Sequence, residues 1–468
     1  MNSEEFRKAG YRIIDWVADY RARVGSLPVM AKTEPGAIKA QLPATPPQQP
    51  EPFDAILEDL DTVVLPGITN WQHPRFFGYF PSAGALSSVL GDYVSTGLAV
   101  VGLAWQSSPA LTEVEEVTVE WLRQMLGLST GWSGVINDTA STSTLVALLC
   151  ARERATKYSL AAGGLQDQPS PLVVYCSAHS HSSVEKAAVL AGFGKHNVRL
   201  VPQDDANAMR AEALEQMVQE DLSGGRVPCA VVATTGTTTT TALDPIGALA
   251  TVARAHGLWL HVDAAMAGSA MILPECRWMW DGIEGADSIV VNPHKWLGAV
   301  FDCTLYFVRD PEHLVRVMST NPSYLQSAAD GRVKNYRDWG LPLGRRFRAL
   351  KLWFLIREQG VEGLQARLRR DMANAKWLEQ QIAGAPGWKV LAPVVLQTLC
   401  VRHEPDGLSG EALDKYTLEW AGRLNQSGEA YVTPAILNGR WMVRISIGAE
   451  LTEREHIAQL WRLMNENL

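Results

Sequence analysis

Five short apolar runs between residues 172 and 308 lack polar alternation, and this feature constrains the fold more than any other. The runs occupy residues 172–175, 230–233, 258–262, 289–291 and 304–308. Most are separated by stretches of helical periodicity, such as the one that starts at Asp244 and Pro245, with Asp244 as a good N-cap, and ends at Gly257. Strands without alternation are buried on both faces, as in parallel sheets. The sequence therefore predicts an α/β fold with a mainly parallel central sheet.

The N-terminal region predicts a helix that is tethered away from any local core. Apolar side chains recur at helical spacing from Phe6 to Tyr20, and prolines then crowd residues 43–52 before a second amphipathic stretch at residues 53–65. An apolar helix face displaced in this way usually packs on another lobe or subunit. We therefore expect an intertwined oligomer.

Two more helices and a smaller lobe are expected further along the chain. Ser108 as N-cap and Pro109 in the first turn begin a helix that ends near Gly127. Another helix starts at residues 344–347 and extends to Gly360, and from about residue 361 the pattern becomes helix, strands and helix. This last region predicts a small α+β lobe.

Composition favours a small-molecule ligand. The chain has 468 residues, 47% of them apolar, and a formal net charge of −8 with dispersed Lys and Arg, which argues against a nucleic-acid or anionic-membrane partner. Its six cysteines form no C-x-x-C pair and indicate buried thiols in a reducing compartment. The N-terminus lacks a signal-peptide core, and the longest apolar run, near residues 97–105, is about half a membrane span. We expect a cytoplasmic protein.

Lys295 and Asp263 each follow one of the apolar runs. Lys295 lies in Asn-Pro-His-Lys-Trp at residues 292–296, and Asp263 closes the run at residues 258–262. Pyridoxal phosphate (PLP) chemistry needs such a pair, because a lysine amine condenses with the cofactor's aldehyde and a carboxylate keeps its ring nitrogen protonated. Taken singly, either residue could be an ordinary surface lysine or loop aspartate, so the pair needs independent support.

Two more segments bear on this hypothesis. Residues 138–144, Asp-Thr-Ala-Ser-Thr-Ser-Thr, precede an apolar helical stretch and predict a phosphate site at a helix N-terminus, although ordinary capping would look the same. The sequence has neither a Walker-type nor a Gly-x-Gly-x-x-Gly motif. His179 and His181 could bind a metal, stack on a flat ring or be ordinary loop residues, and no third metal ligand is evident.

The ordered set of motifs resembles one family. Trp-Gln-Ser-Ser-Pro at residues 105–109, His-Val-Asp-Ala-Ala at 261–265, Asn-Pro-His-Lys-Trp at 292–296 and Pro-Leu-Gly-Arg-Arg-Phe at 342–347 are similar to the PLP-dependent group II decarboxylases. Among these, the chain resembles the aromatic L-amino-acid (DOPA-type) decarboxylases, and bacterial members most closely. The resemblance implies PLP fold type I (aspartate aminotransferase-like), with a helical swapping segment at residues 1–82, a large PLP-binding α/β domain at 83–345 and a small α+β domain at 346–468.

The resemblance also implies roles for individual residues. Lys295 would bind the cofactor aldehyde, Asp263 the pyridine nitrogen, His181 would stack on the ring, and Tyr324 would donate a proton, these four being the catalytic set. The cofactor site would comprise Thr139, Ala140, Ser141, His181, Thr238, Asp263, Ala265, Asn292, His294 and Lys295. The substrate pocket would comprise Tyr79, Phe80, Ser82 and His181, joined by Val101 and Leu103 from the second subunit of a homodimer. No metal is implied.

The implied reaction is decarboxylation of an aromatic L-amino acid to its amine and CO2 through a PLP quinonoid. L-DOPA is the first choice, with tyrosine, tryptophan and phenylalanine as further candidates. Histidine decarboxylase, aromatic aldehyde synthase and aminotransferase remain alternatives within the fold. Relatives with phenylalanine at the position of Tyr324 tend to form aldehydes, so tyrosine there favours simple decarboxylation. A non-catalytic binding protein is a further alternative, raised by 16 tryptophans, most of which fall in apolar stripes.

Overall fold

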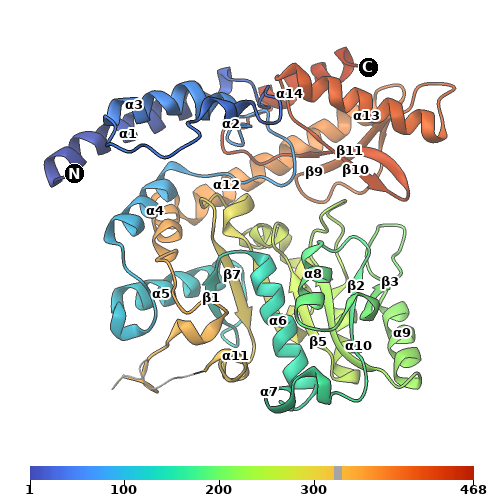
Figure 1. The fold of residues 1–468 in the computed structure, drawn as a ribbon. Helices are drawn as coiled ribbons and strands as arrows, with labels where there is room; N and C mark the ends of the chain where they lie inside the picture. Colours follow the sequence, from blue (N-terminus) through green and yellow to red (C-terminus); the bar gives the residue numbers. More distant parts are fainter. Residues whose placement is uncertain (321–328) are drawn as a thin grey trace. The chain divides into compact units, whose positions relative to one another are not determined.

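The computed structural model describes residues 1–320 and 329–468, and these form two compact units (Figure 1). The large unit comprises Ser82–Arg370 and Ala392–Thr398. The terminal unit comprises Met1–Pro81, Asp371–Leu391 and Leu399–Leu468, so it contains both the N-terminal helices and the C-terminal lobe. The three-part division expected from the sequence stays a prediction. Tyr324 lies outside the described residues.

A seven-stranded sheet forms the centre of the large unit, in the order β1-β7-β6-β5-β4-β2-β3. Strands β2 to β6 pair in parallel, whereas β7 runs antiparallel to both β6 and β1. The predicted mainly parallel α/β sheet is therefore confirmed. The strands are β1 (Ser133–Asn137), β2 (Leu172–Ser177), β3 (Val198–Val201), β4 (Val227–Thr234), β5 (Trp259–Asp263), β6 (Ser288–Val291) and β7 (Thr304–Val308).

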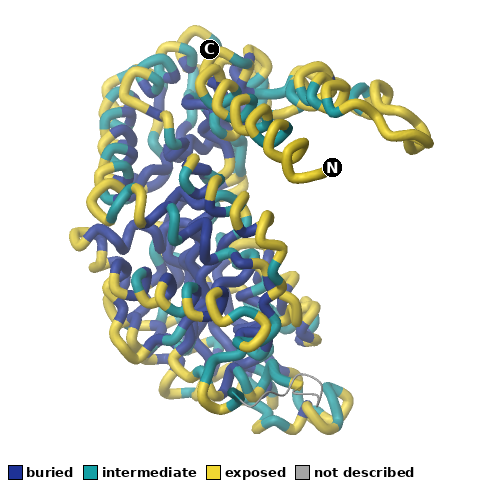
Figure 2. The backbone as a smooth tube through the Cα atoms, turned by 90° about the vertical axis from the view of Figure 1, so that its left-hand side faces the viewer, coloured by how far each residue is buried: buried dark blue, intermediate teal, exposed yellow. Residues whose placement is uncertain are grey.

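Helices surround this sheet and bury its apolar faces. Val146 and Cys150 of α6 pack with Val174 of β2 and Val232 of β4 in one hydrophobic cluster, drawn dark blue within Figure 2. All six cysteines are buried thiols, as predicted. The α-helices wholly within this unit are α4 (Leu86–Leu98), α5 (Pro109–Met125), α6 (Ala140–Ala155), α7 (Leu160–Gly163), α8 (Ser183–Leu190), α9 (Ala211–Ser223), α10 (Ile246–His256) and α11 (Pro311–Met318).

The predicted helix ends are confirmed in two places and wrong in one. The Ser108 side chain accepts a hydrogen bond from the Leu111 amide and caps α5, and Gly257, with a φ of 69°, ends α10. Asp244 does not cap α10. Its two carboxylate oxygens instead accept hydrogen bonds from the amides of Met209 and Thr234, each at 2.7 Å. Burial raises the pKa of this carboxyl to about 6.

A second, four-stranded sheet has the order β10-β11-β9-β8, with antiparallel pairs β10–β11 and β8–β9, as the predicted α+β lobe requires. Helix α12 (Ala349–Ala383) links the units, and its helical dihedrals break at Gly360, where the sequence predicts an end. The strands are β8 (Trp388–Val390), β9 (Thr398–His403), β10 (Thr433–Leu437) and β11 (Arg440–Ser446), and the C-terminal helices are α13 (Gly410–Ser427) and α14 (Arg454–Glu466).

The N-terminal helices are α1 (Ser3–Arg23), α2 (Ala37–Gln41) and α3 (Phe53–Asp59). Asn2 and Glu5 form a capping box at the start of α1. None of the residues of α1 is buried, and Figure 2 shows its exposed backbone. Among the described helices, none is long and apolar enough to cross a membrane.

Candidate active site

The carboxyl ends of six strands, β1 to β6, lie at one edge of the large sheet. Strand β1 is antiparallel to β7, which is antiparallel to β6, so β1 points the same way as β2, β4, β5 and β6. The residues that follow these strands therefore gather at this edge, where α/β proteins bind ligands. The predicted site residues in these loops are Thr139, Ala140, Ser141, His181, Thr238, Asp263, Ala265, Asn292, His294 and Lys295.

Asp263 and Lys295 both come within electrostatic reach of His181. Burial lowers the pKa of His181, the Asp263 carboxylate opposes this shift, and the Lys295 ammonium adds to it. Asp263 is the last residue of β5 and is 5% exposed, and one of its oxygens accepts a hydrogen bond from the Ala265 amide at 3.1 Å. A buried carboxylate and an amine therefore both lie near the His181 imidazole at the sheet edge.

The tautomer of His181 follows from its hydrogen bonds. The Ser183 amide donates to Nδ1 at 3.2 Å, and the Ser183 hydroxyl lies 2.7 Å from the same atom. An N–H donor requires a lone pair at Nδ1, so the neutral ring carries its proton on Nε2. Because its pKa is lowered, the ring is neutral at pH 7 and can lie flat against another aromatic ring without adding a charge.

The segment that carries Lys295 is fixed on both sides. The Asn292 amide donates to the carbonyl of Ala265 at 2.9 Å, and the Lys295 amide donates to the carbonyl of Asn292 at 3.0 Å. His294 is buried, and its Nδ1 accepts from the Cys303 amide at 3.0 Å. Burial and then the Lys295 charge lower the pKa of His294 to about 4, so this imidazole is also neutral at pH 7.

The loop after β1 ends at the N-terminus of α6. Thr139 is the N-cap, its carbonyl accepts from the Ser143 amide at 3.2 Å, and its hydroxyl lies 3.5 Å from the Thr142 amide. The amides of Ala140 and Ser141 belong to the first turn, whose N–H groups have no acceptor within an α-helix. They and the helix dipole suit a phosphate group.

Thr304 is a residue of this edge that sequence reasoning missed. Its buried hydroxyl lies 2.9 Å from Oδ1 of Asn292 and 3.0 Å from the carbonyl oxygen of Asp138. Because β7 is antiparallel to its neighbours, its first residue lies beside the last residue of β1, as the Asn137–Thr304 pairing shows. The sequence shows only a hydroxyl at the start of an apolar run, and it does not reveal that this strand runs antiparallel to its neighbours.

The loop after β4 contains Thr237, which stabilises the loop, and Thr238, which is predicted to contact the cofactor ring. The Thr237 hydroxyl accepts from the Ala242 amide at 3.0 Å and lies 3.1 Å from the Thr240 hydroxyl, so it holds the loop closed. Thr238 is partly exposed beside it, and Ala265 after β5 is 8% exposed. Both are small side chains that leave room for a ring.

The predicted substrate-pocket residues fall in both units. In the large unit, the Ser82 hydroxyl donates to the His294 carbonyl at 3.2 Å, and Val101 is 55% exposed in the single chain, near the partly buried Leu103. Tyr79, which is 48% exposed, and Phe80 belong to the terminal unit. The composition of the pocket therefore stays a prediction.

The donor set at the sheet edge fits PLP. It offers an amine for the aldehyde, a buried carboxylate for the pyridinium, a neutral imidazole for the ring face, and helix-terminal amides with hydroxyls for the phosphate. Within the part of the chain that the structure describes, no group of three or more His, Cys, Asp or Glu side chains could hold a metal ion.

Comparison with known proteins agrees with this assignment. The model of the pyridoxal-dependent decarboxylase conserved domain matches residues 35–404. The chain is 39% identical to the aromatic-L-amino-acid decarboxylase of Catharanthus roseus over 100% of its length and 94% of that protein. It is 38% identical to the phenylacetaldehyde synthase of Arabidopsis thaliana, covering 100% of this chain and 96% of that protein. The crystal structure of Oryza sativa TDC with PLP and tryptamine superposes with a TM-score of 0.97 at 38% identity, covering 100% of this chain and 98% of that one.

Proposed function

The chain belongs to the pyridoxal-dependent decarboxylase family, with PLP as its cofactor, and on this premise we propose that it converts L-DOPA, as the preferred aromatic L-amino acid, to its amine and CO2. One observation supports the site assignment: Asp263, at the end of β5, and Lys295, after the parallel neighbour β6, both come within electrostatic reach of His181 at the carboxyl edge of the sheet. Relatives named as aromatic-L-amino-acid, tryptophan and tyrosine decarboxylases support the aromatic substrate class.

Bound PLP supplies a protonated ring that accepts the electrons of the bond being broken. In our proposal, Asp263 keeps a proton on the ring nitrogen, which a buried carboxylate does well because little water screens its charge. Lys295 would hold the cofactor through its aldehyde carbon. Neutral His181 covers one ring face, and Thr139, Ala140, Ser141, Asn292 and His294 surround the phosphate, while Thr238 and Ala265 border the ring.

A second candidate reaction is aldehyde formation. It is favoured by the 38% identity to a phenylacetaldehyde synthase. Tyr324 argues for decarboxylation, because a tyrosine with an ordinary pKa near 10 can donate a proton to the substrate carbon at neutral pH. On this basis, Tyr324→Phe shifts the product from amine and CO2 toward aldehyde, CO2, ammonia and hydrogen peroxide, with dissolved O2 as the oxidant. Amine as the only product of that variant would contradict the role of Tyr324.

We also propose a cytoplasmic homodimer with active sites at the subunit interface. Exposed apolar side chains on and after α4, namely Leu90, Leu98 and Val101, support the interface, and six buried free thiols support a reducing compartment. A helix α1 without buried residues fits the same interpretation. Removal of residues 1–45 should change the number of subunits in the oligomer, as measured by light scattering. An unchanged oligomer would count against a role for this segment.

A product assay tests the reaction and the substrate together. The holoenzyme is incubated with L-DOPA, tyrosine, tryptophan, phenylalanine and histidine, and amine, aldehyde, CO2 and peroxide are measured in the same samples. We expect amine and CO2 in equal amounts, with L-DOPA giving the highest kcat/KM. Peroxide and aldehyde as main products would favour the synthase, and turnover of histidine alone would overturn the aromatic assignment.

A further inference from the structure

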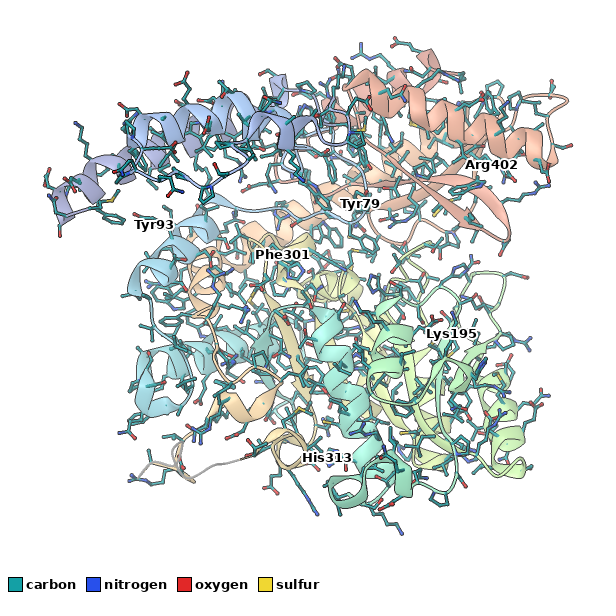
Figure 3. All side chains as sticks on the ribbon, viewed as in Figure 1. Tyr79, Tyr93, Lys195, Phe301, His313 and Arg402 are labelled. Atoms are coloured by element: carbon teal, nitrogen blue, oxygen red, sulfur yellow. The ribbon has the colours of Figure 1, made fainter. Side chains whose placement is uncertain are left out.

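Tyr79 has a backbone conformation that is unusual for a tyrosine. Its φ is 50°, in the left-handed region that glycine favours, yet its side chain is 48% exposed (labelled in Figure 3). Such conformations persist where neighbouring groups hold them, and they concentrate at ligand sites. Neighbouring groups must therefore stabilise the left-handed backbone of Tyr79 and its exposed ring.

The segment before Tyr79 is joined to the C-terminal sheet. The Phe77 amide donates to the Tyr431 carbonyl at 2.8 Å, and the Phe77 carbonyl accepts from the Ser446 amide at 2.9 Å. A Cβ at Gly78 would overlap the Tyr431 ring, so glycine permits this close approach. The segment is thus bridged to Tyr431, just before β10, and to Ser446, the last residue of β11.

The backbone and the ring of Tyr79 are both held by this sheet. Its amide donates to the Thr433 hydroxyl at 2.7 Å, and its carbonyl accepts from the Arg444 guanidinium at 3.2 Å. Its ring stacks on Trp71, with centroids 5.3 Å apart, and on Tyr431, with centroids 5.9 Å apart. Its hydroxyl lies 3.2 Å from the Tyr431 hydroxyl.

We propose that Tyr431 is a positioning residue that holds Tyr79 in its left-handed conformation and thereby sets the affinity for the substrate's aromatic side chain. Tyr431 contacts Tyr79 by ring and by hydroxyl, and it is itself anchored on buried Phe76, with centroids 5.4 Å apart and planes at 3°. The inference rests on the proposed function and on the prediction, from the family resemblance, that Tyr79 lines the substrate pocket.

The test separates the stacking contact from the hydroxyl contact. Tyr431→Leu removes both, whereas Tyr431→Phe keeps the ring. Aromatic pairs contribute enough that losing this one should raise KM about 2- to 10-fold. We expect that rise for Tyr431→Leu, with the same rise in the Ki of the product amine as a competitive inhibitor, an unchanged kcat and wild-type PLP content. Tyr431→Phe should restore most of the affinity.

The matched control is Tyr416→Leu. Tyr416 is another tyrosine of the terminal unit, whose hydroxyl lies 2.7 Å from Nδ1 of His403. This variant should leave KM and Ki unchanged. Thr433→Val removes the hydroxyl that accepts from the Tyr79 amide, and it should also raise KM. This variant provides the test if Tyr431→Leu does not fold.

Two results would overturn the positioning role. One is a Tyr431→Leu enzyme with wild-type KM and Ki. The other is a joint loss of kcat, PLP content and thermal stability in both Tyr431→Leu and Tyr431→Phe. Such a loss would show that Tyr431 has a general structural role. The proposed function fails separately, when the wild-type holoenzyme decarboxylates none of the aromatic amino acids.

Discussion

The Thr304 hydroxyl lies 2.9 Å from the side-chain oxygen of Asn292. The same hydroxyl is 3.0 Å from the carbonyl of Asp138, directly before the N-cap of α6. Thr304 therefore joins the loop that leads to Lys295 with the loop proposed to bind the cofactor's phosphate. Its position at the start of antiparallel β7 makes this bridge possible.

Thr304→Val should weaken PLP binding without changing the size of the side chain. A neutral hydrogen bond contributes about 1 kcal/mol, so the dissociation constant should rise about 2- to 10-fold. Thr304→Ser, which keeps the hydroxyl, is the control and should bind like the wild type. Equilibrium dialysis of each apoenzyme with PLP measures the dissociation constants. Equal constants for the wild type and the two variants would contradict a role of Thr304 in PLP binding.

Asp263→Asn should lower kcat about 100-fold or more, because a neutral amide no longer favours a proton on the cofactor's ring nitrogen. PLP should still bind through its phosphate and Lys295. The control is Asp287→Asn, which removes a carboxylate beside the start of β6, where Asp287 accepts from the Leu260 amide at 2.8 Å. Steady-state assays compare them, and a wild-type kcat for Asp263→Asn would contradict the assignment.

His261 should make the protein less stable in mild acid. Burial lowers its pKa from 6.5 to about 4, against the opposing charge of Asp263. The unfolded chain therefore binds more protons between these two values, so stability is lost as the pH falls through them. By pH 5 the loss relative to pH 7 should be about 2 kcal/mol from this residue.

Urea unfolding of wild type and His261→Asn at both pH values measures that difference. His261 lies 2.9 Å from the Ser288 hydroxyl, so the variant should be less stable at pH 7 but should lose about 2 kcal/mol less on acidification. The control is His256→Asn, which changes a partly buried histidine at the C-terminal end of α10 that bonds to Glu215. Equal acid sensitivity in wild type and His261→Asn would refute the interpretation.

Leu90→Lys should weaken the proposed dimer. Leu90 is 46% exposed on α4, near Tyr93, which Figure 3 labels. Burying a leucine contributes about 1.5–3 kcal/mol, so its loss should raise the dimer dissociation constant about 10- to 100-fold. Leu222→Lys on α9, at an equal 46% exposure, should leave it unchanged. Light scattering across a dilution series distinguishes the two, and equal behaviour would exclude α4 from the interface.

The sequence was sufficient to predict that the candidate site residues gather at one edge of the sheet. Unalternating runs predict parallel strands, and parallel strands bring their carboxyl ends together, so Asp263, Asn292 and Lys295 had to converge. The helix ends at Ser108 and Gly257 were equally readable, because capping depends on the residues next to them.

Contacts between residues far apart in the sequence could not be predicted in the same way. Asp244 had the sequence of an N-cap, but its carboxylate bonds to the amides of Met209 and Thr234, and nothing local in the sequence indicates that competition. Thr304 was missed because its contacts depend on the antiparallel direction of β7, which an apolar run does not reveal. The contacts of Tyr79 with Tyr431 join residues 352 positions apart.

The most direct test of the central claim is the CO2 and amine formed from aromatic L-amino acids by the wild-type holoenzyme and by Lys295→Ala, both loaded with PLP. The account predicts equal amounts of CO2 and amine from the wild type and no measurable product from Lys295→Ala. Release of CO2 by Lys295→Ala at the wild-type rate, or none by the wild type from any of these substrates, would contradict it.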